Sequence, residues 1–540
     1  MNEPGAAQPR SDRYPSIVAA ALVFFAATFV RLRLLPAPLE RDEGEFAYIG
    51  QLMLNGFAPF AHAYSMKLPG TSAAYALIMS VLGQNSVGIH LGLLVVNAAC
   101  VVLLHLLARR LLGPECAWFA SASYAAMSVS MAVLGVLAHA THFVVLFTLA
   151  GLLLLRRAED HDGGVWLLAS GFCFGLAITM KQHAAIFLLF GCLVAWRSGR
   201  ERRGARWLAT YARPALVLAG AVILGVIVLL VMAQAGALDA MWFWTVRYAR
   251  AYVSAQPAAG AFRAFSGAVA LILQSQMPFW FLAAAGAFDQ WRKAPSIDDR
   301  TFMAGFGLFS LAAVMPGWYF RPHYFVMLLP SVALFAAASI RPLGRLVSSA
   351  GFEGARRYLP PFLLLASTAF VGLAERDALF RESPATMSRS VNGENPFPEA
   401  VEVAAHVRSL TSAGDRIAVL GSEPEIYFYS GRLSATGYIY MYGLFENQPY
   451  ASTMQRELIS EIESARPKCV VFVDVPNSWG VMAIPPGPFR DWMDSFLAGG
   501  YELVGVADMV DPFTTRYVWG RTAAAYTPVS RSVLKVYRRR

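Results

Sequence analysis

Long apolar stretches recur from residue 16 to residue 376 and are the most regular feature of this sequence. An α-helix of about 20 apolar residues crosses the hydrocarbon core of a bilayer. We count about eleven such stretches, with ends uncertain by several residues. They lie near residues 16–35, 86–108, 116–136, 139–155, 164–180, 182–196, 213–234, 265–288, 302–318, 323–340 and 359–376. The pattern predicts a polytopic α-helical membrane protein.

The pattern changes after residue 377. Residues 416–421 (RIAVLG) and 469–475 (CVVFVDV) have the composition of buried strands, and 397–410 and 455–465 have the period of amphipathic helices. We therefore predict a transmembrane domain over residues 1–376 and a soluble α/β domain over residues 377–540. Because neither a Walker motif nor GxGxxG occurs, the sequence gives no support for nucleotide binding in the second domain.

The charge distribution predicts which loops face which side. The net charge is +10, but the basic residues cluster in short loops between apolar stretches, which argues against nucleic-acid binding. The basic loops contain Arg109 and Arg110, Arg156 and Arg157, 197–206, 292–300 and 341–345. The positive-inside rule places them in the cytoplasm. Residues 36–85, 235–264 and everything after 377 then lie on the outer side.

The outer loop 36–85 begins with an acidic motif, RDEGEFAYIG, at residues 41–50. Asp42 is suited to cap a helix, with Glu45 completing a capping box. The apolar positions that follow share one face as far as Gly56, which predicts a short helix on the membrane surface. A second such helix is expected over about 71–82.

Basic residues are rare in the outer loops, so those present need an explanation. They are Arg41, Lys67, Lys181, Arg247, Arg250, Arg263 and Arg321. They either bind an anionic ligand such as a lipid phosphate or reach toward lipid headgroups. Beside such cations, Asp42 or Glu43 could serve as a general base. The alternative for both carboxylates is a purely structural role at the start of the helix.

Several other outer residues have both a structural and a functional interpretation. His139 and His142 are three positions apart on one helix face, and either pack between helices or contact a metal, a phosphate or the acceptor. The aromatic residues of 241–253, including Tyr248, fit either an interfacial belt or a surface on which a sugar or prenyl group stacks. Arg321, His323 and Tyr324 lie together in an outer turn. Tyr248 and Tyr324 are candidate contacts to the acceptor or substrate.

The motif RDEGEFAYIGQLMLNGFAPF, followed by YSMKLPGTSAAYALIMSVLG, resembles the first outer loop of GT-C glycosyltransferases. It is most similar to bacterial members of the protein mannosyltransferase and aminoarabinose transferase superfamily. ITMKQHAAIFLL, YFRPHYFVMLLPSVALF and GDRIAVLGSEPEIYFYSGR support this resemblance. It implies eleven to thirteen spans in the bacterial cytoplasmic membrane. It also implies transfer of a sugar from a polyprenyl-phosphate donor to a hydroxyl acceptor at the outer face, mostly with inversion.

The resemblance also implies roles for individual residues. Asp42 matches the leading catalytic aspartate, Glu43 its partner, and Lys67 the lysine of a KPP motif that contacts the donor phosphate. Lys181, Arg247, Arg250 and Arg321 are further candidates for phosphate binding. His323 matches a histidine that helps to hold a divalent metal in some members. This chain departs from them at Met66, where some relatives have a metal-binding glutamate, and in reading KLPG instead of KPP.

Three functions compete at this point. The first is the glycosyltransferase, acting on a lipid, polysaccharide or protein acceptor. The second is a lipid or solute transporter, which would more often have ionisable or broken helices at the bilayer midplane. The third is a non-catalytic protein that binds a lipid phosphate or a partner. The span interiors are almost free of charge, whereas the loops are not, and this favours the first function.

Overall fold

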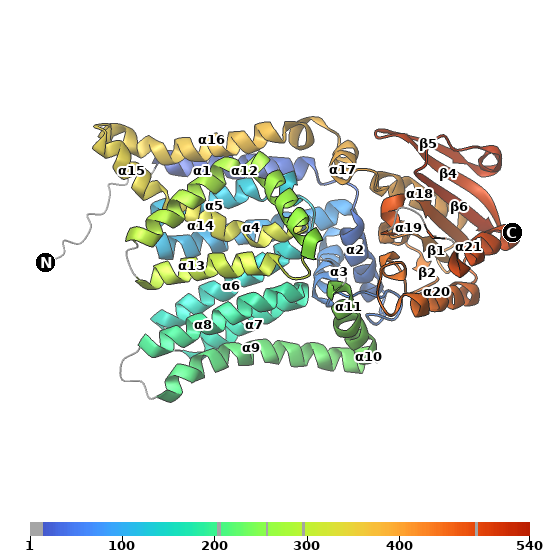
Figure 1. The fold of residues 1–540 in the computed structure, drawn as a ribbon, viewed down its shortest axis with the longest axis horizontal. Helices are drawn as coiled ribbons and strands as arrows, with labels where there is room; N and C mark the ends of the chain where they lie inside the picture. The colour runs from blue at the N-terminus through green and yellow to red at the C-terminus, as the bar shows by residue number, and fades with distance from the viewer. Residues whose placement is uncertain are drawn as a thin grey trace. The chain divides into compact units, whose positions relative to one another are not determined.

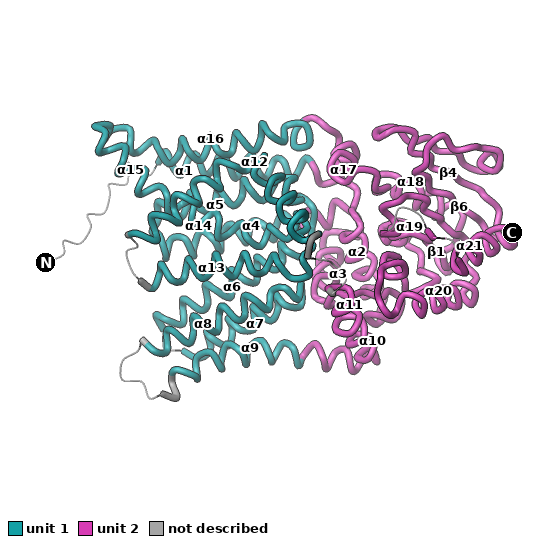
Figure 2. The backbone as a smooth tube through the Cα atoms, viewed as in Figure 1, with its two compact units in different colours: residues 1–33, 93–226, 258–380 teal, residues 34–92, 227–257, 381–540 magenta. Residues whose placement is uncertain are grey.

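The computed structural model describes residues 14–161, 163–201, 207–254, 258–293, 297–480, 484–485 and 487–540. The chain divides into two compact units, each assembled from several stretches of sequence (Figure 2). Unit 1 contains residues 1–33, 93–226 and 258–380, and unit 2 contains residues 34–92, 227–257 and 381–540. The acidic outer loop therefore belongs to the same unit as the C-terminal segment.

Unit 1 is built from helices that run alongside one another (Figure 1). Each predicted apolar stretch overlaps an α-helix, but the helix in 116–136 ends at Met127 and the one in 323–340 begins at Leu329. These helices are α1 (Tyr14–Arg33), α4 (Ser86–Leu112, shared with unit 2), α5 (Pro114–Met127), α6 (Ala140–Asp160), α7 (Gly164–Met180), α8 (Ala185–Glu201), α9 (Trp207–Gln234, shared with unit 2), α12 (Ala258–Lys293), α13 (Ile297–Val314), α14 (Leu329–Ala338) and α16 (Leu359–Ala374). Among the described residues, six helices are long and apolar enough to cross a membrane. The fold is thus that of a multi-pass membrane protein, and the number of spans stays a prediction.

Two glycines permit a close crossing of α7 and α9. A Cβ on Gly171 would lie 1.8 Å from the carbonyl oxygen of Val217, and one on Gly220 would lie 2.0 Å from that of Leu168. Because helices in lipid associate chiefly through close van der Waals packing, small residues at such crossings stabilise the bundle.

Unit 2 contains two short helices from the outer loop. α2 (Arg41–Leu54) and α3 (Gly70–Leu82) pack against each other. The predicted surface helices therefore form, but the apolar face of α2 is covered by protein, since Phe46, Ile49 and Leu52 are buried. Residues 238–254 add α10 (Leu238–Trp242), a π-helical segment (Phe243–Tyr248) and α11 (Ala249–Ser254).

The C-terminal part of unit 2 contains a mixed six-stranded sheet with the order β2-β1-β3-β6-β4-β5 (Figure 1). β1 (Arg416–Leu420) is parallel to β2 (Leu433–Ser434) and β3 (Cys469–Asp474), and the remaining pairs are antiparallel. The other strands are β4 (Tyr501–Asp511), β5 (Thr514–Trp519) and β6 (Val533–Arg539). The helices are α17 (Pro384–Asn392), α18 (Phe397–Leu410), α19 (Pro424–Ser430), α20 (Ala451–Ala465) and α21 (Pro488–Gly500). The two predicted strands and two predicted helices are confirmed.

Candidate active site

The acidic motif forms the first turn of α2. The helix begins at Arg41, and Glu40 is its N-cap. The Glu40 side chain accepts a hydrogen bond from the Glu43 amide at 2.9 Å, and Glu43 accepts one from the Glu40 amide at 3.1 Å. The predicted capping box of Asp42 and Glu45 is therefore wrong by two residues. As a result, Asp42 and Glu45 are not used for capping.

Asp42 and Glu45 instead hold the ammonium group of Lys67. The two acids are three positions apart on one face of α2. Lys67 Nζ donates to Asp42 Oδ1 at 2.8 Å and to Glu45 Oε2 at 2.6 Å, and it lies 4.5 Å from the centre of the Phe46 ring. Ser65 donates its hydroxyl hydrogen to the second oxygen of Glu45 at 2.5 Å. This arrangement gives Glu45 a role in binding Lys67 in place of the expected capping role.

The Asp42–Lys67 pair combines charge with access to solvent. The side chains of Asp42 and Lys67 are 24% and 22% exposed, whereas that of Glu45 is 5% exposed. Burial alone would lower the pKa of Lys67, but the carboxylates of Asp42 and Glu45 outweigh it and raise that pKa above its ordinary value. Lys67 is therefore a permanent cation that a ligand can reach.

Glu43 faces a different partner and is fully buried. Its Oε1 lies 3.0 Å from His90 Nε2, and His90 Nδ1 lies 2.8 Å from the carbonyl oxygen of Leu35. Because a carbonyl oxygen can only accept, Nδ1 carries a hydrogen, and a second proton must then be shared between Nε2 and the Glu43 carboxylate. This geometry fixes the first turn of α2 and turns Glu43 away from Lys67.

In unit 1, two of the predicted histidines stack on each other. The rings of His139 and His323 are 4.0 Å apart and nearly parallel. Tyr324 packs edge-on against His323 at 4.8 Å and against His183 at 5.0 Å, and Lys181 Nζ lies 4.2 Å above the Tyr324 ring. Four predicted residues (Lys181, His139, His323 and Tyr324) are thus brought into one cluster. Since metal sites usually have three or more protein ligands, two imidazoles would need further ligands to hold an ion.

The loop that precedes His139 is held by hydrogen bonds to two charged side chains. Glu375 accepts hydrogen bonds from the amide of Met131 at 2.7 Å, the amide of Ala132 at 3.1 Å and the hydroxyl of Ser130 at 2.6 Å. Arg31 donates to the carbonyl oxygens of Ser128 and Gly135 in the same loop. The loop that ends at His139 is therefore held by two charged side chains. One comes from the last turn of α1 and the other from the residue that follows α16.

The remaining predicted residues are more scattered. His142 is fully buried in the first turn of α6, where neither of its ring nitrogens has a hydrogen-bond partner among the described residues. Arg321 is exposed, with its guanidinium 5.7 Å from the centre of the Tyr319 ring. Arg247 and Arg250 are exposed on the segment 238–254.

Tyr248 belongs to the hydrophobic core of unit 2. It packs edge-on against Trp244 at 5.3 Å, and Trp244 stacks on Tyr64 at 4.9 Å. Trp244 and Tyr248 are 8% and 7% exposed, so these two rings are core residues, whereas Trp242 is 54% exposed. The proposed contact of Tyr248 with an acceptor stays a prediction.

Sequence reasoning did not find His90 or the link between Glu45 and Lys67. A histidine in the first turn of an apolar span was the available signal for His90, because ionisable residues are rare there. For Glu45, the signal was its spacing from Asp42, since residues three apart share a helix face.

Comparison with known proteins supports the resemblance. Residues 66–232 match the sequence model of the dolichyl-phosphate-mannose-protein mannosyltransferase family. ArnT from Cupriavidus metallidurans bound to undecaprenyl phosphate has a similar structure, with a TM-score of 0.59 at 12% identity over 97% of both chains. The archaeal oligosaccharyltransferase AglB from Archaeoglobus fulgidus, in complex with an inhibitory peptide and a dolichol-phosphate, gives 0.53 at 13% identity. That match covers 95% of this chain and 75% of AglB. No curated protein matches the chain in sequence.

The ArnT structure thus contains undecaprenyl phosphate, and the structure of the oligosaccharyltransferase AglB contains a dolichol-phosphate. The helical unit and the C-terminal sheet occur together in the GT-C fold, as the sequence predicted. The chain therefore has the GT-C fold and carries, over residues 66–232, the sequence pattern of the dolichyl-phosphate-mannose-protein mannosyltransferase family.

Proposed function

We propose that this protein is an inverting glycosyltransferase of the outer face of the bacterial cytoplasmic membrane. It would move a sugar from a polyprenyl-phosphate donor to a hydroxyl acceptor, with its C-terminal domain outside the cytoplasm. The observation that carries the proposal is the contact of Asp42 with Lys67 at 2.8 Å, both partly exposed. A carboxylate that can accept a proton then lies beside a cation that can bind a phosphate.

The chemistry follows from these two groups. Asp42 takes the proton of the acceptor hydroxyl as its oxygen attacks the anomeric carbon of the donor. The bond between that carbon and the phosphate oxygen breaks, and polyprenyl phosphate leaves with the bonding electron pair. Lys67 stabilises the negative charge that develops on the phosphate. Because attack and departure occur on opposite faces of the sugar, the configuration inverts.

The remaining site residues have supporting roles in this proposal. Glu43 orients Asp42 through the first turn of α2. Lys181, Arg247, Arg250 and Arg321 are proposed as further phosphate contacts. His139, His142, Tyr248 and Tyr324 are proposed as contacts to the acceptor or substrate. His323 is a candidate ligand for a divalent metal, which would supply additional positive charge at the phosphate.

A donor panel tests this function. The full chain, purified in lipid nanodiscs, is incubated with undecaprenyl phosphate carrying mannose, other hexoses, pentoses or aminoarabinose and with an envelope extract as the acceptor source. The expected result is protein-dependent release of undecaprenyl phosphate and appearance of a product with inverted configuration for at least one sugar. In a parallel assay with the protein in closed lipid vesicles, movement of the intact donor across the bilayer without cleavage would contradict the proposal and favour a transporter.

A further inference from the structure

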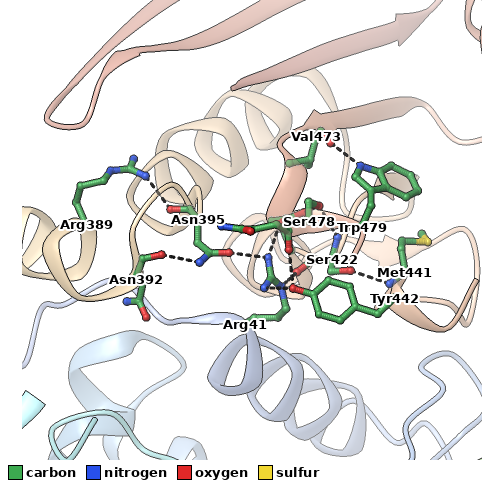
Figure 3. Close-up of polar contacts among 12 residues, drawn as sticks. Arg41, Arg389, Asn392, Asn395, Ser422, Met441, Tyr442, Val473, Ser478 and Trp479 are labelled. Atoms are coloured by element: carbon green, nitrogen blue, oxygen red, sulfur yellow. Dashed lines mark hydrogen bonds and ion pairs between the residues drawn. The ribbon is translucent and has the colours of Figure 1, made fainter. Parts of the chain in front are cut away.

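The side chain of Arg41, which precedes the proposed base, is enclosed by residues of the C-terminal segment (Figure 3). Its Nε donates to the carbonyl oxygen of Ser422 at 2.5 Å, and Nη1 donates to Tyr442 Oη at 2.7 Å. Nη2 donates to Asn395 Oδ1 at 3.1 Å and to Glu423 Oε1 at 3.0 Å. The guanidinium is therefore held in one orientation by four acceptors.

Two of these acceptors lie at the carboxyl end of β1, whose neighbour β3 runs parallel to it. Ser422 and Glu423 follow β1, and Ser478 follows β3. The Ser478 hydroxyl donates to Glu423 Oε2 at 2.5 Å and accepts a hydrogen bond from the Ser422 amide at 2.9 Å. In α/β sheets this edge is where ligands usually bind. Here it binds the guanidinium of Arg41.

Other residues on the same face of α2 as Arg41 also contact the C-terminal segment. Gly44 is so close to α19 that a Cβ would lie 2.7 Å from the Glu425 amide nitrogen. Tyr48 accepts a hydrogen bond from the Ser434 amide at 2.8 Å, and its ring stacks on Tyr427 at 5.1 Å. Arg41, Gly44 and Tyr48 follow helical spacing, whereas Asp42 and Glu45 lie on another face, toward Lys67.

We propose that Arg41 is a positioning residue, which fixes the first turn of α2 at the carboxyl edge of the sheet and thereby holds Asp42 in the orientation needed for proton transfer. This inference rests on the proposed function of Asp42. It gives the C-terminal segment a direct part in catalysis, because Ser422, Glu423 and Tyr442 set the position of the neighbouring base.

Lysine cannot replace arginine in this place. The planar guanidinium directs several hydrogens at fixed angles, whereas an ammonium group has one centre on a flexible stem. Although burial alone would lower the pKa of Arg41, Tyr442 and Glu423 outweigh it and raise that pKa, so the group keeps its charge. Arg41→Lys therefore keeps the positive charge but loses the fixed directions of the guanidinium hydrogen bonds. Tyr442→Phe is a milder variant that removes one acceptor and retains the ring.

The test compares Arg41→Lys and Tyr442→Phe with Arg432→Lys in nanodiscs. Arg432 belongs to the same unit and is half-buried, and its guanidinium donates to Thr411 Oγ1 at 2.9 Å and to the Thr411 carbonyl oxygen at 2.8 Å. The first readout is kcat and the donor KM with the best donor of the panel. We expect kcat to fall about 10- to 100-fold in Arg41→Lys and about threefold in Tyr442→Phe, with the donor KM unchanged, because a displaced base affects only the chemical step.

The second readout is amide hydrogen exchange over residues 43–49. Exchange should be faster in Arg41→Lys than in wild type, while strands β1 and β3 stay protected. Wild-type kcat in a folded Arg41→Lys protein, or an equal fall in Arg432→Lys, overturns the positioning role. Asp42→Asn separates the two proposals: if it is fully active, the proposed function fails, and if it is inactive while Arg41→Lys is unaffected, only this inference fails.

Discussion

Lys67 Nζ lies 2.8 Å from Asp42 Oδ1 and 2.6 Å from Glu45 Oε2, so one cation bridges two acids on a single helix face. Without it, the two carboxylates would repel each other three positions apart on α2. The two ion pairs of Lys67 therefore stabilise the loop. In our proposal, they also place the ammonium group where it can bind a phosphate.

Lys67→Met should weaken binding of undecaprenyl phosphate by about tenfold or more, because a charge-assisted hydrogen bond is lost. Native mass spectrometry of the full chain with undecaprenyl phosphate measures this change. Lys535→Met is the matched control, since Lys535 also pairs with a carboxylate, that of Asp474 at 3.4 Å. Equal affinities for wild type and Lys67→Met would remove Lys67 from the phosphate site.

The raised pKa of Lys67 predicts how the binding of undecaprenyl phosphate should depend on pH. It is raised above the ordinary value of 10.5, so the stabilisation from this ion pair is complete below that value and is lost only as the pH rises through the higher folded-state value. The contribution of Lys67 to binding undecaprenyl phosphate should be constant between about pH 7 and about pH 9. The difference in affinity between wild type and Lys67→Met, measured across this range, would contradict the assignment if it disappeared by the upper limit.

His90→Ala should destabilise the protein more than Glu43→Gln does. Removing the imidazole takes from the fully buried Glu43 carboxylate the group that shares its proton, which costs about 3 kcal/mol or more. Glutamine at position 43 can instead donate an amide hydrogen to a neutral His90. Thermal unfolding in nanodiscs measures both variants, and equal midpoints would show that the shared proton does not stabilise this turn.

Gly44→Ala should displace α2 from α19, at a cost of about 1–3 kcal/mol, because the added Cβ would meet the backbone nitrogen and the side chain of Glu425. Gly499→Ala is the control, since Gly499 is also helical and has open space around its Cα. Unfolding midpoints and transfer rates of both variants test this contact. Wild-type behaviour of Gly44→Ala would show that the close approach is not required.

Glu375→Ala should loosen the loop that ends at His139. The loss removes the acceptor of the Met131 amide and leaves the Ala132 amide with the Ser130 hydroxyl at 3.2 Å, which costs about 1–3 kcal/mol for such groups. Faster hydrogen exchange at residues 130–135 is the expected result. Glu463→Ala provides a control on an exposed glutamate, which accepts a hydrogen bond from Trp492 Nε1 at 2.9 Å. Unchanged exchange in Glu375→Ala would show that Arg31 alone fixes the loop.

The sequence predicted the features that depend on local patterns. The apolar stretches and the strands around residues 416–421 and 469–475 could be predicted, because the local period and composition of the sequence are enough to identify them. The start of α2 could not be predicted, since the choice between Glu40 and Asp42 as the cap depends on Lys67, 25 positions from Asp42. The hydrogen-bond partners of Arg41 could not be predicted either, because Glu423 is 382 positions away in the sequence.

The central claim is that Asp42 is the base of a sugar-transfer reaction. Asparagine at this position keeps the size of the side chain but accepts no proton, so Asp42→Asn should lower the rate of transfer by about 10²- to 10⁴-fold. Single-turnover transfer from the best undecaprenyl-phosphate sugar, measured together with binding of that donor, is the direct test. We expect a folded Asp42→Asn protein that binds the donor and does not transfer the sugar. Transfer at the wild-type rate would contradict the role of Asp42 as the base.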